Sequence, residues 1–290
     1  MDAQSAVTTC YRHPKVESHV RCTRCDRYMC PDCMREASVG HQCVDCVKEG
    51  ARSIRRARTA FGGRITAVPI VTYVLLGLNV AAYLGELVRP GLVRRFDMLG
   101  AVPPGYLPEG VAYGEWYRLL TSGFLHLLPD EGIGVVHIVM NMASLWTIGR
   151  VVEAQLGRVR YLALYLLSLL GGSVLEMLIS PDARAVGASG AIFGLGAAYY
   201  VLARRLGFGM SEVNRYMTGL LLWLVLSSWF ASWQGHLGGL LTGGAVALAY
   251  AYAPRDGRRV LVQTGACVGL LVLLVVLAWA KATQLTGGAV

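Results

Sequence analysis

Charged residues are scarce in this chain of 290 residues, and acidic ones are the scarcer kind. Only 16% of the residues are charged, with 18 acidic against 27 basic side chains, whereas 54% are hydrophobic. A soluble domain has too little interior to bury that much apolar surface. The composition therefore excludes an ordinary soluble protein and predicts a polytopic membrane protein.

Cysteine is almost absent after residue 46, since seven of the eight cysteines lie before that point and only Cys267 lies after it. This distribution excludes a secreted disulfide mini-protein and predicts a small cysteine-rich head on a membrane body. The first 46 residues are polar and contain cysteine and histidine, so we expect no cleavable signal peptide.

Seven runs of mainly apolar residues reach the length of about 20 residues that is needed to cross a bilayer. They lie at 65–88, 134–153, 159–180, 186–203, 213–231, 233–253 and 260–281. The sequence therefore predicts an all-α polytopic membrane protein with seven spans.

Basic residues predict which ends of these runs face the cytoplasm. Those ahead of the first run are Lys48, Arg52, Arg55, Arg56, Arg58 and Arg64. Basic residues at 158–160, 204–215 and 255–259 fall on the same side, whereas the opposite short connections carry only Arg184 or no charge. We expect a cytoplasmic N-terminus and, after seven spans, a C-terminus outside.

The cysteine-rich head contains four pairs of metal-binding residues, each with a two-residue gap that lets both side chains bind one tetrahedral zinc ion. Eight ligands predict two closed, structural Zn²⁺ sites. Of the possible pairings we favour a cross-braced arrangement, in which the first pair joins the third and the second joins the fourth. The first site is Cys10, His13, Cys30 and Cys33, and the second is Cys22, Cys25, Cys43 and Cys46. The pattern, over about residues 8–48, resembles a B-box-like zinc finger.

A disulfide framework is the alternative for these cysteines, but seven is an odd number and the cytoplasm is reducing. His41, two residues before Cys43, is an alternative ligand, and we expect His19 at the surface. Closed zinc sites supply folding free energy to a module that is too small for a core. We therefore expect a binding or regulatory role for the head, not catalysis.

Polar groups within the apolar runs are costly and mark candidate functional sites, and four of them stand out. His137 and Asn141 lie in the second run, Ser189 in the fourth and His236 in the sixth. These runs all cross from outside to inside, and each carries its polar residue about three or four positions after its start. At about 1.5 Å of rise per residue, all four lie within about 5 Å of one depth, just below the outer surface.

Small residues repeat at every fourth position beside Ser189 and His236. They are Gly190, Gly194 and Ala198 in one run, and Gly235, Gly239 and Gly243 in the other. In lipid, this spacing lets helix backbones approach closely. Ordinary helix packing explains the glycines alone but not the accompanying serine and histidine. We expect this approach to bring Ser189 within hydrogen-bond reach of His236.

These motifs resemble those of the rhomboid intramembrane serine proteases. Gly187-Ala188-Ser189-Gly190 is similar to the family's GxSG motif, Gly235-His236-Leu237-Gly238-Gly239 to its sixth-span histidine motif, and His137-x-x-x-Asn141 to its second-span HxxxN motif. Tyr117-Arg118 resembles the WR element of the first outer loop, with tyrosine in the usual place of tryptophan. The likeness covers about 65–254 and implies a six-span rhomboid-like helical bundle, to which 260–281 adds a seventh span.

The resemblance implies a Ser–His dyad without a third carboxylate. Ser189 would be the nucleophile, and His236 would take its proton and return it to the leaving amine. His137 and Asn141, four apart on one helix face, would stabilise the oxyanion together with the backbone N–H of Ser189. The residues with supporting roles would be Phe193, which should stack on His236, and Gly187, Gly190, Gly239 and Arg118.

Two further polar residues have weaker cases. Glu176 is the nearest acidic candidate for orienting His236, although packing or loop exposure is the favoured explanation. We expect His126 to be structural and hydrogen-bonded within the outer loop.

The sequence thus predicts a B-box-like double zinc-binding domain at 1–50, a basic linker at 51–64, the rhomboid-like core at 65–254, and the seventh span with a tail at 255–290. The expected function is that of a rhomboid-type serine endopeptidase of the bacterial plasma membrane that cleaves transmembrane protein substrates within the lipid bilayer. We expect no cofactor for catalysis and no nucleic-acid partner, and the zinc finger would bind a cytoplasmic protein.

The alternative function is that of a non-proteolytic rhomboid-like binding or quality-control factor. Such relatives typically lack the serine or the histidine, and this chain has both. A transporter fits less well because inverted repeats are not evident. A zinc protease is disfavoured because the sequence lacks an H-E-x-x-H motif.

Overall fold

A computed structural model of the chain describes residues 8–53, 57–103, 105–229 and 232–287. The chain divides into two compact units, Met1–Ala57 and Arg58–Val290. Arg55 and Arg56, which we expected ahead of the first span, lie outside the described residues.

The first unit has little regular structure. It contains the 3₁₀ turn η1 (Pro31–Cys33), the strands β1 (Met34–Glu36) and β2 (His41–Cys43), and helix α1 (Val44–Ser53). The strands pair antiparallel, with Met34 opposite Cys43. The buried apolar side chains of this unit are Met29 and six cysteines. A unit of this size needs more stabilisation than these side chains supply, which is the usual reason for a bound metal.

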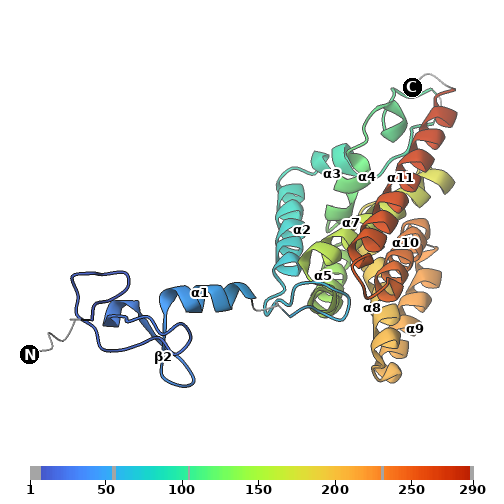
Figure 1. Ribbon diagram of the computed structural model, residues 1–290. Coiled ribbons are helices and arrows are strands. Elements are labelled where there is room, and N and C mark those ends of the chain that lie inside the picture. Colours follow the sequence, from blue (N-terminus) through green and yellow to red (C-terminus); the bar gives the residue numbers. More distant parts are fainter. Residues whose placement is uncertain (1–7, 54–56, 104, 230–231, 288–290) are drawn as a thin grey trace, which may run out of the picture. The chain divides into compact units, whose positions relative to one another are not determined.

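The second unit is built from helices (Figure 1). Its unbroken long helices are α2 (Ile70–Val88), α7 (Arg158–Ile179), α8 (Ser189–Leu206), α9 (Met210–Ser227), α10 (Trp233–Tyr252) and α11 (Arg259–Leu285). The second apolar run forms a helix in three parts, namely α5 (Val135–Ser144), the π-helical η4 (Leu145–Gly149) and α6 (Arg150–Leu156). Each of the seven predicted runs is therefore largely helical.

Four helices are long and apolar enough to cross a membrane by length and composition. They are Ile70–Val88, Val135–Leu156, Arg158–Ile179 and Arg259–Leu285. The other three predicted spans, α8, α9 and α10, are also helical; glycines are frequent in α8 and α10, and polar residues lie in the first turns of α9. A total of seven spans therefore stays a prediction.

Two helices begin later than the apolar runs suggest, and in each case the backbone explains the difference. α2 begins at Ile70 and not near residue 65, directly after Pro69, because proline disfavours a helical conformation in the residue before it. α8 begins at Ser189, because Gly187 has a φ of +130° that a helix does not allow. Ser189 is thus the first residue of its helix, and the expectation that it lies a turn inside the helix was wrong.

The glycine repeats form the contact face between α8 and α10, as the sequence predicts. A Cβ atom on Gly239 would collide with the carbonyl oxygen of Gly190, and one on Gly243 would collide with the Cα atom of Gly194. Because glycine has no side chain, the two backbones can approach this closely. α7 packs against both helices and contributes Tyr161 to the same buried core.

A buried carboxylate holds the start of α2. Glu153 of α6 is fully buried and accepts the backbone N–H groups of Val71 at 3.1 Å and Thr72 at 2.8 Å. These N–H groups belong to the first turn of α2, where no carbonyl of the helix can accept them. The carboxylate therefore ties the second predicted span to the first.

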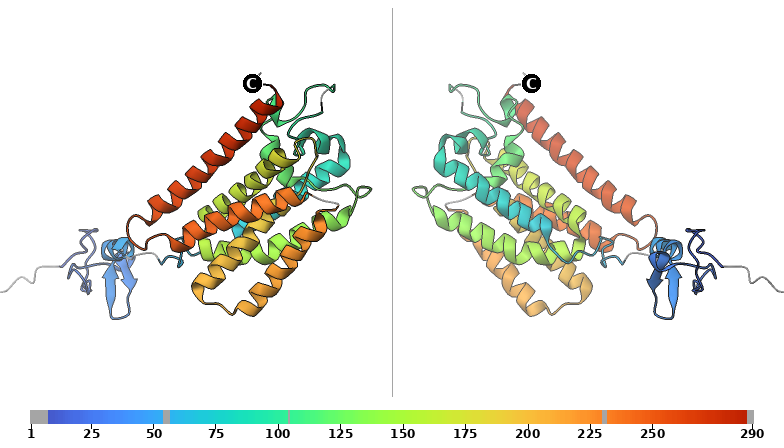
Figure 2. Two further views of the ribbon diagram at one scale, coloured as in Figure 1. Left: turned by 90° about the vertical axis from the view of Figure 1, so that its right-hand side faces the viewer. Right: turned by 90° about the vertical axis from the view of Figure 1, so that its left-hand side faces the viewer.

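Residues 89–134 connect α2 to α5 and form short helical turns. They contain α3 (Gly91–Phe96), η2 (Val111–Tyr113), α4 (Arg118–Thr121) and η3 (Ser122–Phe124). Val111 of this connection is buried in one cluster with Met177 of α7 and Ala278 of α11. The last helix, α11, therefore packs on α7 and on this connection, and it belongs to the same compact unit as the preceding helices (Figure 2).

Candidate active site

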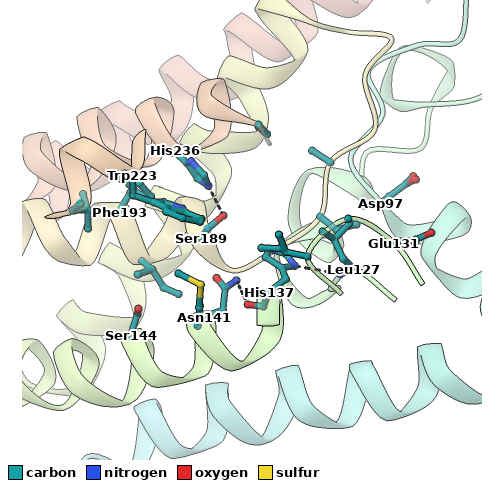
Figure 3. A pocket seen from close by; sticks show the side chains of 18 of the residues that line it. Asp97, Leu127, Glu131, His137, Asn141, Ser144, Ser189, Phe193, Trp223 and His236 are labelled. Carbon is teal, nitrogen blue, oxygen red and sulfur yellow. Dashed lines mark hydrogen bonds between the residues drawn. The ribbon is translucent and has the colours of Figure 1, made fainter. Parts of the chain in front are cut away.

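Ser189 and His236 meet where α8 and α10 begin. The Oγ atom of Ser189 lies 2.9 Å from Nε2 of His236, which is hydrogen-bond distance (Figure 3). Phe193, one turn after Ser189, stacks on the imidazole with ring centroids 4.4 Å apart and planes inclined by 9°. The expected stacking is thus present, and the close packing of α8 on α10 brings the hydroxyl to the imidazole.

The other imidazole nitrogen of His236 contacts a residue that the sequence analysis missed. Ser227, the last residue of α9, is fully buried, and its Oγ atom lies 3.0 Å from Nδ1 of His236. The same hydroxyl donates its proton to the carbonyl oxygen of Leu224 at 3.1 Å. Because a serine hydroxyl has one proton, it accepts the hydrogen from Nδ1.

This bond decides which nitrogen of His236 carries the proton. With the hydrogen on Nδ1, Nε2 is a free acceptor and faces the hydroxyl of Ser189. An imidazole in this tautomer can remove the serine proton. The only hint in the sequence is a Ser227–Ser228 pair near the end of the fifth apolar run, and that pair does not show which serine would face His236.

His137 and Asn141 lie on the first turns of α5, across the cavity from His236 (Figure 3). Nδ1 of His137 accepts the backbone N–H of Leu127 at 3.2 Å, so the ring proton is on Nε2. A Cβ atom on Gly187 would lie 2.9 Å from that Nε2 atom and 3.5 Å from Ser189 Oγ. The donor nitrogen of His137 and the hydroxyl of Ser189 therefore both border the space beside Gly187.

Asn141 is buried, and its Nδ2 atom donates to the carbonyl oxygen of His137 at 2.8 Å. An amide nitrogen has two hydrogens, so a second donor remains. The backbone N–H of Ser189 is a third donor. It lies in the first turn of α8, where N–H groups lack helical partners and the helix dipole favours negative charge.

A cavity of about 880 Å³ contains these groups. α5, α8 and α9 line it, together with parts of the outer connection and the first residues of α10. The helix residues that line it include His137, Met140, Asn141, Ser144, Ser189, Ile192, Phe193, Arg215, Tyr216, Gly219, Leu220, Trp223 and His236. The cavity is large enough to admit several residues of an extended peptide beside Ser189.

A buried ion-pair network ties the outer connection to the loop that leads into α8. Arg118 is 1% exposed and donates to Asp97 at 2.5 Å, to Glu109 at 2.9 Å and to Glu115 at 2.8 Å. Arg184, five residues before Ser189, pairs with Asp97 and Glu109 at 2.8 and 2.9 Å. The sequence motif identified Arg118, but its acidic partners were missed because they carry no motif.

Within this network, the negative charge of Glu115 is locally stabilised. Burial alone would raise the pKa of Glu115, but the hydrogen bonds from the Gly110 N–H and from Arg118 outweigh it and hold that pKa below the ordinary value. Glu115 is therefore a carboxylate at neutral pH and a permanent partner of Arg118.

Glu176 does not orient His236 directly. It is buried and hydrogen-bonded to the hydroxyl of Ser232, and that hydroxyl accepts the backbone N–H of Gly235 at 3.0 Å. Ser232 is therefore the N-cap of α10. Glu176 thus holds the start of the helix that carries His236.

His126 is a buried residue of the outer connection, as expected for a structural role. The backbone of Phe124, in the same connection, hydrogen-bonds the ring of His126. The backbone N–H of His126 donates to Glu86 at 3.1 Å. The ring packs against His137 with centroids 5.2 Å apart. Burial, with a smaller contribution from His137, lowers the pKa of His126 to about 3, so the ring is neutral.

The metal-binding residues of the first unit form the two groups that we expected. The ligand atoms of Cys10, His13, Cys30 and Cys33, and those of Cys22, Cys25, Cys43 and Cys46, lie within 4.8 Å of one another in each group. Either group could hold a metal ion.

The distances within the two groups fit zinc better than disulfides. Cys25 Sγ and Cys43 Sγ are 3.7 Å apart, and His13 Nδ1 is 3.2 Å from Cys30 Sγ. Two sulfurs bound to one tetrahedral zinc ion lie about 3.8 Å apart, whereas a disulfide bond is about 2.05 Å long. His41 lies in β2 and belongs to neither group, and His19 is exposed.

Comparison with known proteins identifies the family. Residues 113–253 match the Rhomboid domain. Rhomboid-like protease 3 of Toxoplasma gondii is 30% identical over 196 residues, which are 64% of this chain and 67% of that relative. The chain belongs to the rhomboid family. With its apolar helices, this rhomboid is an integral membrane protein.

Two further relatives match this rhomboid over only part of their own length. Rhomboid protease GluP of Bacillus subtilis is 36% identical over 160 residues, 52% of this chain and 30% of GluP. RHOMBOID-like protein 6, mitochondrial, of Arabidopsis thaliana is 33% identical over 167 residues, 56% of this chain and 51% of the relative. The likeness to these two relatives therefore concerns about a third to a half of their length.

Proposed function

We propose that this rhomboid is an intramembrane serine endopeptidase that cleaves transmembrane segments of other membrane proteins. The observation that carries the proposal is the 2.9 Å contact between Ser189 Oγ and His236 Nε2 at one wall of a large cavity. The names of its protease relatives support the same class of activity. The dyad needs no catalytic cofactor.

In the proposed reaction, Ser189 Oγ attacks the carbonyl carbon of the scissile peptide bond while its proton moves to Nε2 of His236. The bond from Nδ1–H to Ser227 keeps the imidazole in the accepting tautomer. His236 then gives the proton to the leaving amine, which yields an acyl-enzyme. Water deprotonated by the same imidazole hydrolyses the ester and restores the serine hydroxyl.

Three donors would stabilise the negative oxygen of the tetrahedral intermediate, namely the backbone N–H of Ser189, Nε2–H of His137 and the free amide hydrogen of Asn141. Losing one such donor typically costs about 3–4 kcal/mol of transition-state stabilisation. Arg118 would act through the ion-pair network, which holds the loop before Ser189. Gly187, Gly190 and Gly239 would act by allowing the close approach of backbone and side chains around the dyad.

The proposed substrates are transmembrane helices with residues that weaken the helix. A stable helix hides its peptide groups, so the segment must unwind before Ser189 can reach a carbonyl. The cavity between α5 and α9 could receive such an unwound stretch, and a small residue at the cleavage site would fit best. We place Ser189 near the outer face of a bacterial plasma membrane, with the N-terminus cytoplasmic and the C-terminus outside.

For the first unit we propose a B-box-like structural module with two Zn²⁺ ions that binds a cytoplasmic protein. Cross-bracing of the two ligand groups and the scarcity of apolar core residues support this assignment. The metal would serve folding, and no step of peptide hydrolysis involves it.

The decisive experiment compares wild type with Ser189→Ala on a transmembrane peptide substrate in detergent. We expect the variant to lose activity by at least about 1,000-fold. Ser211→Ala, which removes an exposed hydroxyl from α9, should cleave like wild type. Equal cleavage by wild type and Ser189→Ala would exclude the serine mechanism. Binding without cleavage by both would instead favour the non-proteolytic alternative.

A further inference from the structure

Four arginines gather at the end of the second unit that lies opposite the Ser189–His236 pair. The arginine cluster consists of Arg58, Arg160, Arg255 and Arg259. These residues come from the stretch before α2, the first turn of α7, the connection after α10 and the first residue of α11. α8 and α10 start at the catalytic pair and run toward this end, where α10 leads into α11 (Figure 2).

A buried amide joins the segments that carry the cluster. Gln263 of α11 is 3% exposed, and its Nε2 atom donates to the carbonyl oxygens of Phe61 and Tyr250, each at 3.2 Å. Its Oε1 atom accepts Nε of Arg160 at 2.8 Å. The first turns of α7 and α11 are thereby held against residues 59–62 and the end of α10.

Two other arginines wrap the same turn. Arg259 donates to the carbonyl oxygen of Ala60, and Nη1 of Arg58 donates to that of Gly62 at 3.2 Å. A Cβ atom on Gly62, whose φ is +86°, would lie 3.3 Å from the guanidinium of Arg259. Neutral carbonyls and one amide therefore position the cluster, and they leave its positive charge uncompensated.

Within the described part of the chain, no member of the cluster forms an ion pair. The neighbouring Asp256 pairs with Arg258 instead. Arg58 repels Arg160, and Arg160 and Arg255 both repel Arg259. Guanidinium groups stay charged at any physiological pH, so this repulsion persists until an anion binds.

Several hydrogen-bond donors of the cluster have no acceptor among the described residues. The Nη atoms of Arg160 and the whole guanidinium of Arg255 have no acceptor among residues 8–53, 57–103, 105–229 and 232–287. Nε of Arg259 is buried without a partner there. Planar guanidinium groups match the oxygens of a phosphate, which can accept several of these hydrogens at once.

The position of the cluster indicates where that phosphate comes from. α7 and α11 are both apolar enough to span a membrane, and the cluster lies at their first turns. Residues at the end of a span lie at the level of the lipid headgroups. Basic pockets between the ends of spans are suited to anionic headgroups.

We propose that the arginine cluster binds the phosphate of an anionic phospholipid and that the bound headgroup fastens the seventh helix to the rest of the unit. The headgroup bridges the first turns of α7 and α11 and the turn at 59–62. This site is independent of peptide hydrolysis.

The test uses the full-length Ser189→Ala protein in a neutral detergent and follows its thermal unfolding while phosphatidylglycerol is added. We expect a saturable rise in the midpoint. Arg160→Gln and Arg255→Gln should each raise the half-saturating lipid concentration about fivefold. Because Arg255 bonds to no described residue, Arg255→Gln keeps the fold intact while it removes one charge. The matched control is Arg204→Gln, an exposed arginine at the end of α8.

Three results would overturn the proposal. Phosphatidylcholine could stabilise the protein as well as phosphatidylglycerol does, which would remove the requirement for net negative charge. Arg204→Gln could weaken the response as much as the cluster variants, which would indicate general attraction to basic residues. Inorganic phosphate alone could give the full rise, which would identify a site for a soluble anion.

Discussion

At the scale of single residues, the hydrogen bond between Ser227 and Nδ1 of His236 fixes the tautomer of the imidazole. Ser227 is a positioning residue, because it contacts the imidazole and not the reacting atoms. Its hydroxyl donates a hydrogen bond to the carbonyl oxygen of Leu224, 3.1 Å away. The hydroxyl oxygen therefore accepts the hydrogen bond from Nδ1–H of His236. A neutral hydroxyl in this place fixes the tautomer without adding a charge inside the membrane, where an unpaired carboxylate is costly.

Ser227→Ala should lower kcat about tenfold and leave KM nearly unchanged, because it leaves the Nδ1–H group of His236 unpaired without touching the substrate. Ser227→Thr keeps a hydroxyl and should recover most of the rate. The control is Ser228→Ala, since Ser228 is exposed and its hydroxyl donates to the carbonyl oxygen of Val225 and not to His236. An unchanged kcat in Ser227→Ala would show that the imidazole is oriented in another way.

The sequence could predict residues whose identity and spacing carry the chemistry. Ser189, His236, His137 and Asn141 are polar groups in apolar surroundings, and each stands in a recognisable motif. Ser227 could not be predicted, because a serine near a helix end is common and its partner is nine residues away across a turn. The pairing of Arg184 with Asp97 was equally hidden, since the two residues are far apart in sequence and meet only through the fold.

At the scale of elements, the reactive geometry depends on how closely α8 and α10 pack. Four backbone positions, Gly190, Gly194, Gly239 and Gly243, set that separation. The repeat of small residues was readable from the sequence, and so was the partner helix. The first residue of α8 could not be predicted from the sequence. The chain turns before this helix through the positive φ of Gly187, and a hydropathy pattern does not report backbone angles.

Gly239→Ala should destabilise the protein by about 1–3 kcal/mol, because the added methyl group has no space beside the Gly190 carbonyl. The helices would move apart, so cleavage should fall by more than the loss of folded protein accounts for. Gly244→Ala in the same helix is the matched control, since its Cβ atom would lie 3.8 Å from the nearest atom, Cβ of Ala197. Thermal unfolding and peptide cleavage would be measured on both variants. Equal stability and equal cleavage by the two variants would mean that the spacing of α8 and α10 does not determine the activity.

At the scale of the whole molecule, the two units have different sources of stability. The second unit has a large apolar core, whereas the buried apolar side chains of the first are six cysteines and one methionine. The eight ligands were predictable from residue type and spacing, and the structure groups them in the cross-braced pairing that we expected. The orientation of the chain in the membrane and the partner of the first unit stay predictions.

Protein purified under reducing conditions should contain about two zinc ions per chain. Cys22→Ser should lower that content and unfold the first unit, because a metal site with a missing ligand binds less tightly. Cys267→Ser is the control, since Cys267 lies in α11 and bonds to Tyr250 at 3.1 Å, outside both ligand groups. Metal analysis would be combined with limited proteolysis of the first unit. A zinc content near zero would contradict the assignment.

The π-helical turn at Leu145–Gly149 has a consequence for insertions and deletions. In a regular α-helix, Asn141 and Glu153, 12 positions apart, would point about 120° away from each other. The π turn absorbs one extra residue and so rotates the residues of α6 by about 100° relative to those of α5. Removing a single residue here would lengthen no loop and break no motif. It would still rotate the carboxylate of Glu153 away from α2, while the amide of Asn141 would stay in the cavity.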